Sequence, residues 1–118
     1  MANEKAPHLM EAGEDFGSLA ELVDYQSGSV VSRTLIKTEG GNLTVFSFDQ
    51  GQGLSEHTTP NDAILWVLEG RVQVEIQAER YQLGVGDFIR LPAQIPHALE
   101  ALEKMKMGLM IFQGSADS

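Results

Sequence analysis

The sequence predicts an all-β fold, a single antiparallel β-barrel or jelly roll preceded by a short N-terminal arm with one helical turn. From residue 29 onward, short runs of β-branched and aromatic residues alternate with glycine-containing turns, which is typical of barrels and sandwiches. A length of 118 residues fits one domain with a core of its own. With 42% hydrophobic and 21% charged residues, the composition is that of a folded globular chain.

The N-terminal arm is expected to span residues 1–28, and the barrel residues 29–113. The first residues show no sustained hydrophobic periodicity, so we expect the arm to lie on the barrel or on a dimer partner. The capping-box pattern is matched by Ser18, Leu19, Ala20 and Glu21. An apolar pair follows this pattern, so we expect a single helical turn here.

The strands follow from alternation and turn signals. Residues 30–37 and 43–49 form a predicted hairpin around Gly40 and Gly41. Residues 63–69 and 72–76 form a second predicted hairpin, with Gly70 and Arg71 as its turn. The remaining predicted strands, for a total of about eight, are 81–83, 88–91, 97–102 and 105–112.

The strand over residues 63–69 is apolar on both faces. If Ala63, Leu65 and Val67 point inward, then the outer face carries Ile64, Trp66 and Leu68. A second subunit would cover this outer face, which predicts a homodimer. Packing of the region around Leu19 and Leu22 is the alternative, and the sequence leaves both open.

Composition excludes several classes of site and partner. Without cysteine, the chain has no disulfide and no thiolate metal site. A formal charge of −9 with no basic cluster disfavours nucleic acid as a partner. Residues 1–9 lack a signal-peptide core, and the longest apolar run, 63–68, is too short to span a bilayer. We therefore expect no membrane partner and a cytoplasmic location.

Two spaced motifs carry the chemical signal. In the first, Gly51 is followed after five residues by His57, and Thr59, Ala63 and Gly70 follow at fixed offsets. The second motif places Gly86, Pro92, Gln94, His97 and Ala101 at fixed offsets. Residues 57 and 59 share one face of a strand, and a barrel has only one inside.

The two motifs resemble those of the cupin superfamily, in particular its small single-domain conserved-barrel proteins of the cupin 2 type. In that family, the first motif carries two histidines and a glutamate and the second carries one histidine. The resemblance implies a divalent metal such as manganese, iron, nickel or zinc, held by three imidazoles and a carboxylate. Here Thr59 and Ala63 replace one histidine and the glutamate, so His57 and His97 are the candidate metal ligands.

Two further residues are candidate additions to this incomplete metal set. Thr59 offers a neutral oxygen, and a bulge near Pro60 and Asn61 would turn the carboxylate of Asp62 inward. The predicted binding pocket combines the two histidines with polar and apolar barrel residues. Its predicted members are His57, Thr59, Ala63, Leu65, Val74, His97 and Leu99.

Three functions are compatible with these residues. The first is a small-molecule-binding cupin with a degenerate two-histidine site in an apolar cavity, in which the histidines bind an anionic or carbonyl ligand. The second is a metal-dependent cupin enzyme of the dioxygenase, isomerase or decarboxylase type. The third is a structural or sensory β-module, because a barrel fold alone specifies no function.

Overall fold

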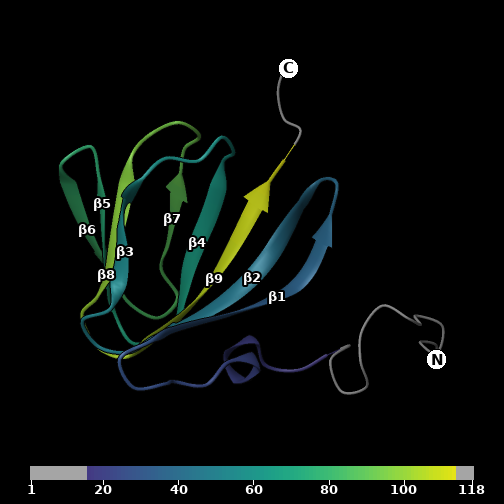
Figure 1. Ribbon diagram of the computed structural model, residues 1–118, viewed down its shortest axis with the longest axis vertical. Helices are drawn as coiled ribbons and strands as arrows, with labels where there is room; N and C mark the ends of the chain where they lie inside the picture. Colours follow the sequence, from purple (N-terminus) through teal and green to yellow (C-terminus); the bar gives the residue numbers. More distant parts are fainter. Residues whose placement is uncertain (1–15, 114–118) are drawn as a thin grey trace.

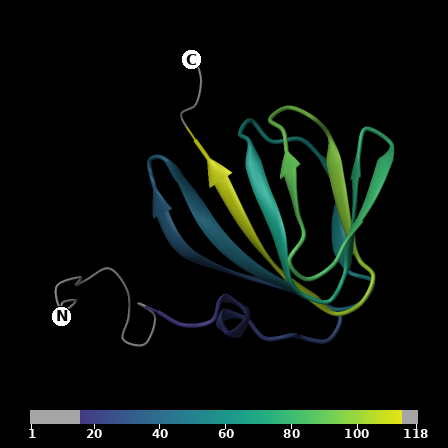
Figure 2. The ribbon, with the colours of Figure 1, turned by 180° about the vertical axis from the view of Figure 1, so that it is seen from behind.

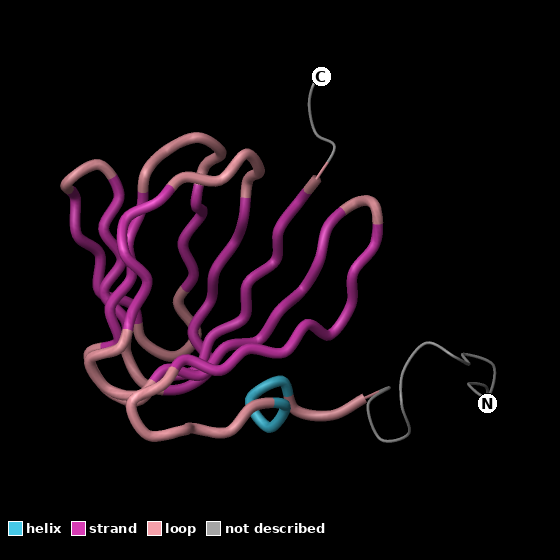
Figure 3. Tube along the Cα trace, in the orientation of Figure 1, coloured by secondary structure: helices cyan, strands magenta, loops and turns pink. Residues whose placement is uncertain are grey.

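Two antiparallel sheets face each other in the computed structural model, which describes residues 16–113 (Figure 1). Strands account for most of these residues, and the one helical turn lies outside the sheets (Figure 3). The larger sheet has the strand order β1-β2-β9-β4-β7. Its strands are β1 (Val30–Thr38), β2 (Gly41–Phe48), β9 (Met105–Phe112), β4 (Ala63–Glu69) and β7 (Phe88–Leu91). The predicted all-β jelly-roll class is confirmed.

The smaller sheet has four strands in the order β3-β8-β5-β6. They are β3 (Gly53–His57), β8 (His97–Ala101), β5 (Val72–Ile76) and β6 (Glu79–Leu83). Seen from behind in Figure 2, the two sheets enclose the space between them like the walls of a barrel. Among the described residues, no helix is long and apolar enough to cross a membrane.

The core fills the space between the two sheets. Alternate residues of each strand point into it, as the sequence predicts. On β4, Ala63, Leu65 and Val67 are buried, while Ile64 and Trp66 are only partly buried. The fully buried side chains include Phe48, Leu65, Val72, Val74, Met105 and Met107. One face of each of these strands is buried. This burial fixes the register in which the strand pairs with its neighbours.

Two details of the predicted strand map are wrong. The predicted hairpin of β4 and β5 does not exist, because the two strands belong to different sheets and pair with other strands. Gly70, with φ of 75°, turns the chain out of the first sheet and into the second. The structure also has a ninth strand, β3, where the sequence shows mainly polar residues.

The segment before β1 lies across the outer face of the larger sheet. It contains the 3-10 helix η2 (Leu19–Leu22), which confirms the predicted helical turn and contacts β2, β4 and β9. The capping-box side-chain bond is absent, and the backbone amide of Glu21 donates to the carbonyl of Ser18 instead. Packing by the region of Leu19 and Leu22 therefore covers part of this face.

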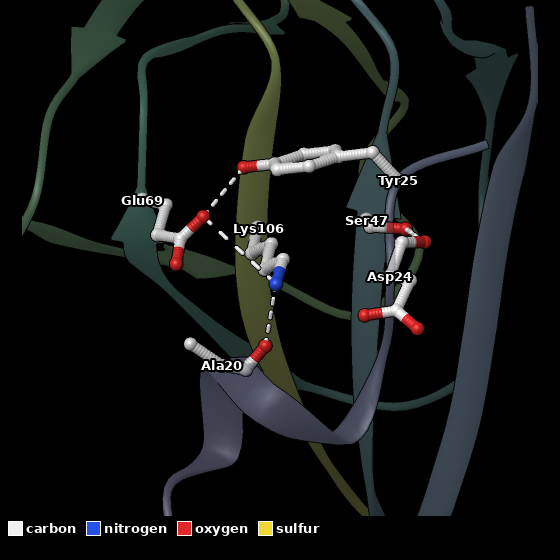
Figure 4. Close-up of polar contacts among 6 residues, drawn as sticks. All are labelled: Ala20, Asp24, Tyr25, Ser47, Glu69 and Lys106. Carbon is white, nitrogen blue, oxygen red and sulfur yellow. Dashed lines mark hydrogen bonds and ion pairs between the residues drawn. The ribbon is translucent and has the colours of Figure 1, made fainter. Parts of the chain in front are cut away.

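A buried lysine ties this segment to the sheet (Figure 4). The ammonium of Lys106 donates to the carbonyl of Ala20 over 2.6 Å and lies 3.9 Å from the carboxylate of Glu69. The hydroxyl of Tyr25 donates to the same carboxylate over 2.7 Å, and the Lys106 ammonium lies 5.0 Å from the centre of the Tyr25 ring. Burial and the Glu69 carboxylate raise the pKa of Tyr25, so this hydroxyl remains a donor.

Candidate functional site

The two histidines of the spaced motifs meet on neighbouring strands of the smaller sheet. His57 ends β3 and His97 begins β8, and the two residues are direct partners in the ladder that joins these strands. Their ring centroids are 4.4 Å apart, with 64° between the ring planes. Residues that oppose each other in an antiparallel pair have side chains on the same face, so both rings border the same space.

Local backbone carbonyls orient both rings. The Nδ1 atom of His57 lies 2.8 Å from the carbonyl oxygen of Ser55, and that of His97 lies 3.3 Å from the carbonyl oxygen of Ile95. A carbonyl oxygen only accepts, so Nδ1 carries the proton in both contacts. In a neutral ring the Nε2 atom is then left with its lone pair and acts as an acceptor.

The two rings differ in their surroundings. His57 is exposed, whereas only 5% of the surface of His97 is exposed. Burial lowers the pKa of His97; the bond to Ile95 opposes this shift, and the nearby His57 adds to it. His97 is therefore neutral at pH 7, and its Nε2 atom presents a lone pair.

A small cavity of about 60 Å³ lies beside the histidines, between the two sheets. Six of the seven predicted pocket residues line it, namely His57, Thr59, Ala63, Leu65, His97 and Leu99. Val74 does not line it and is buried in the core instead. The lining also includes residues outside the predicted pocket, namely Leu54, Leu91, Met107, Leu109 and Ile111. These residues occupy alternate, inward-facing positions along their strands. This alternation is the sequence signal that could have identified them.

The remaining candidate ligands are already engaged in the structure. Oδ1 of Asp62 accepts a hydrogen bond from the backbone amide of Ala93 over 2.7 Å, and Asp62 is exposed and does not line the cavity. Thr59 lines the cavity, and its hydroxyl donates to the carbonyl of Asn61. The backbone amide of Gln94 donates to the carbonyl of Thr59, which fixes the loop after β7 against this segment.

The donor set does not fit a firmly held divalent metal. Among residues 16–113, no group of three or more histidine, cysteine, aspartate or glutamate side chains is placed to bind one ion. Protein sites that hold such a metal normally supply three or four ligands, and carboxylates help to neutralise its charge. Here only two imidazoles are strong donors, the third donor is a neutral hydroxyl that already bonds to Asn61, and no carboxylate neutralises the charge of an ion.

Neither histidine lines a second, larger concavity. It has a volume of about 770 Å³ and is an open groove between β6 and β7, with Tyr81, Phe88 and Arg90 in its walls. The smaller cavity remains the candidate site, because it combines enclosing apolar walls with two converging imidazoles, the combination expected of a ligand site.

Comparisons with known proteins agree with the fold and the motifs. The model of the cupin domain family matches residues 44–112. A conserved protein of unknown function from Streptococcus pyogenes has a similar structure, with a TM-score of 0.82 and 34% identity over 91% of this chain and 93% of its own. A cupin 2 conserved barrel domain protein from Leptotrichia buccalis gives a TM-score of 0.76 and 36% identity, over 80% of this chain and 46% of its own.

One curated relative is an enzyme. Quercetin 2,3-dioxygenase from Bacillus subtilis (strain 168) is 28% identical over 102 residues, which cover 83% of this chain and 28% of the relative. The match thus spans little more than a quarter of that protein. The family match covers more than half of this chain and includes both histidines. The chain therefore belongs to the cupin domain family.

Proposed function

We propose that this cupin binds the polar head group of a small organic ligand through His57 and His97, without a bound metal. The observation that carries the proposal is the pair of rings 4.4 Å apart at a partly enclosed apolar cavity. Apolar walls with a few converging polar groups are typical of small-molecule sites.

The size of the cavity limits what enters it. A cavity of roughly 150 Å³ holds a benzene molecule in a protein core, so about 60 Å³ holds only a few non-hydrogen atoms. A larger ligand would place its head group inside and extend past the exposed ring of His57. The proposed ligand is therefore recognised by its head group rather than by its whole shape.

The tautomers of the two histidine rings determine which head groups can form a hydrogen bond with them. With Nδ1 donating to a backbone carbonyl, the neutral ring of His97 accepts a hydrogen bond at Nε2. A hydroxyl group on the ligand can donate this bond, whereas a carboxylate or carbonyl oxygen needs a protonated ring. This modifies the expectation from the sequence, which names anionic or carbonyl ligands. We propose a hydroxyl-bearing ligand near pH 7 and carboxylate binding only as the pH falls.

Matched pairs of small acids test this proposal. Lactate and propionate differ by one hydroxyl, so each can be titrated into tag-free protein in EDTA while the ring nitrogens of His97 are followed by NMR. We expect lactate to shift the Nε2 signal at pH 7.5 and propionate to do so only at lower pH. His57→Phe removes the second binding ring but keeps the probe and should weaken both responses, and Glu100→Gln, an exposed change on the same strand as His97, should leave them intact.

A metal-dependent cupin enzyme is the second candidate, because the curated relative is a dioxygenase. A metal-dependent enzyme should contain nearly one metal ion per tag-free chain. Both His57→Ala and His97→Ala should lose this ion. The enzyme hypothesis also predicts that shifts of the His97 signals by any acid disappear in EDTA. Either result would contradict the metal-free proposal.

A further inference from the structure

The barrel has an open side between β6 and β7. β6 is an edge strand of the smaller sheet, β7 is an edge strand of the larger sheet, and residues 84–87 form the turn that joins them. Within residues 16–113, β6 pairs only with β5, and β7 pairs only with β4. A groove with a volume of about 770 Å³ lies between the two strands. Sites for small molecules typically have volumes of about 300 to 1,000 Å³.

The inner wall of this groove is apolar. Tyr81 lies opposite the buried Val74 in the strand ladder, and Ile89 lies opposite the buried Leu65. Paired residues point to the same face of a sheet, so Tyr81 and Ile89 both face the interior of the barrel. Tyr81 is nevertheless 44% exposed, because it lines the open groove and no side chain covers it completely. The apolar wall is completed by Ile76, Leu83 and Pro92.

One cation also lines the groove. Arg90 on β7 is exposed, and its guanidinium forms no hydrogen bond or ion pair within residues 16–113. This is notable in a chain with 17 acidic and 8 basic residues. The acid in the lining, Asp87, accepts a hydrogen bond at Oδ2 from the backbone amide of Gly84 over 2.9 Å. The donors of Arg90 are therefore free to bind an anion from solution.

We propose that the groove between β6 and β7 binds an aromatic carboxylate, with its ring against Tyr81 and its carboxylate on Arg90. The planar guanidinium of an arginine donates two parallel hydrogen bonds to a carboxylate. Stacking or edge-to-face contact with an aromatic side chain adds to what burial of the ligand ring contributes. The net charge of −9 disfavours anions in general, so binding requires the ring as well as the charge.

The two strand edges favour a small molecule over an extended peptide. A peptide that adds to a sheet is held mainly by backbone hydrogen bonds along an open edge. β6 has five residues and β7 has four, so each edge offers only a few such bonds. Glu79 and Arg80 also place exposed charges on β6, and short, charged edge strands resist the addition of another strand.

The groove is separate from the histidine cavity, because the two share no lining residue. The ligand of the groove also differs in kind from the one proposed for the cavity. At pH 7.5 a carboxylate without a hydroxyl group should not bind the neutral ring of His97. An aromatic carboxylate at this pH therefore tests the groove independently of the proposed function.

Titration of the full chain with naphthoate at pH 7.5, followed by amide NMR, tests the proposal. We expect the amides of Tyr81 and Ile89 to shift, with a Kd on the order of 1 mM. Arg90→Gln should raise the Kd of naphthoate about tenfold, because a charged hydrogen-bond donor is lost. It should leave the Kd of naphthylmethanol, which has the ring without the charge, unchanged. Tyr81→Leu, which keeps an apolar side chain, should weaken the binding of both compounds about threefold.

Arg80→Gln is the matched control. It removes the same charge from an exposed residue of β6 that does not line the groove, so the Kd of naphthoate should not change. Tyr81 and Arg90 are both exposed, and thermal unfolding should show that their variants fold. Equal losses of affinity in Arg80→Gln and Arg90→Gln would overturn the proposal, because net charge and not the groove would then attract the acid. Shifts confined to His57 and His97 would overturn it too, by placing the acid in the histidine cavity.

Discussion

Replacing His97 by phenylalanine should change how the stability of the protein depends on pH. His97 is buried, and burial lowers its pKa in the folded chain below the ordinary value of 6.5. Between that folded pKa and 6.5, the unfolded chain binds more protons than the folded chain at this position. The contribution of His97 to the free energy of unfolding is therefore constant above about pH 6.5 and decreases as the pH falls through this window.

The size of this effect has an upper limit set by one proton. A single group changes the free energy of unfolding by at most about 1.4 kcal/mol per pH unit. Lowering the pH from 7.5 to 5.5 should therefore destabilise the wild type by up to about 1.4 kcal/mol relative to His97→Phe. For a chain of 118 residues this corresponds to a difference of about 5 °C in Tm.

Urea unfolding at pH 7.5, 6.5 and 5.5 measures this difference directly. At pH 7.5, the variant loses only the 3.3 Å bond from Nδ1 to the carbonyl of Ile95, so we expect a cost of about 1 kcal/mol or less. Thr59→Val is the matched control, because it changes the same cavity without removing a titrating group. If the wild type and His97→Phe differ by the same amount at all three pH values, the argument from burial is refuted.

Three further predictions concern the N-terminal segment, the outer face and the metal. Lys106→Met should lower the free energy of unfolding, measured in urea, by about 1 to 3 kcal/mol, because the carbonyl of Ala20 loses a charged donor. The ion pair with the half-exposed Glu69 adds little to this loss. Gly108→Ala should cost about 1 to 3 kcal/mol in thermal unfolding, because its Cβ overlaps the ring of Trp66. Elemental mass spectrometry should find well under one divalent ion per tag-free chain, and an equimolar ion would contradict the donor count.

The fold was predictable from the sequence where one face of a strand is buried. On β4, alternate apolar residues identify the inner face, and the structure buries Ala63, Leu65 and Val67. β3 was not predictable in this way, because its residues are mostly exposed and it pairs irregularly with β8. A strand of this kind is held by its partner strand and not by its own composition.

The wrong hairpin has a related physical cause. Two strands joined by a short glycine turn can pair with each other or pass into different sheets, and alternation along each strand is the same in both cases. At Gly70 the chain passes into the other sheet because each strand pairs more extensively elsewhere. β4 pairs with β7 and β9, and β5 pairs with β6 and β8. Those pairings join residues far apart in the sequence.

In the candidate site, too, some features follow from the sequence pattern and others depend on contacts formed only in the folded chain. The motif spacing predicts that His57 and His97 share a space, and they are direct ladder partners. The tautomers were not predictable, because they depend on carbonyls of Ser55 and Ile95 brought beside the rings by the local backbone. The position of Asp62 also depends on tertiary structure, since the amide that its carboxylate accepts from lies on the loop after β7.

Restoring the missing donors is the most direct test of why this cavity lacks a complete metal set. Thr59 and Ala63 line the cavity at the positions where the family motif has histidine and glutamate. Thr59→His combined with Ala63→Glu would supply three imidazoles and a carboxylate. Ala63 is buried, so an unpaired glutamate there should cost several kcal/mol and make the metal-free double variant less stable than the wild type.

Added metal should reverse that loss of stability. An ion that binds only the folded chain raises the free energy of unfolding by about 2.7 kcal/mol when its concentration is 100 times its Kd. We therefore expect Mn²⁺ or Zn²⁺ to raise the Tm of the double variant and to leave that of the wild type nearly unchanged. Ala63→Glu alone is the control for the buried charge. If metal fails to stabilise a folded double variant, the strand geometry around the cavity, and not only the two replaced side chains, prevents metal binding.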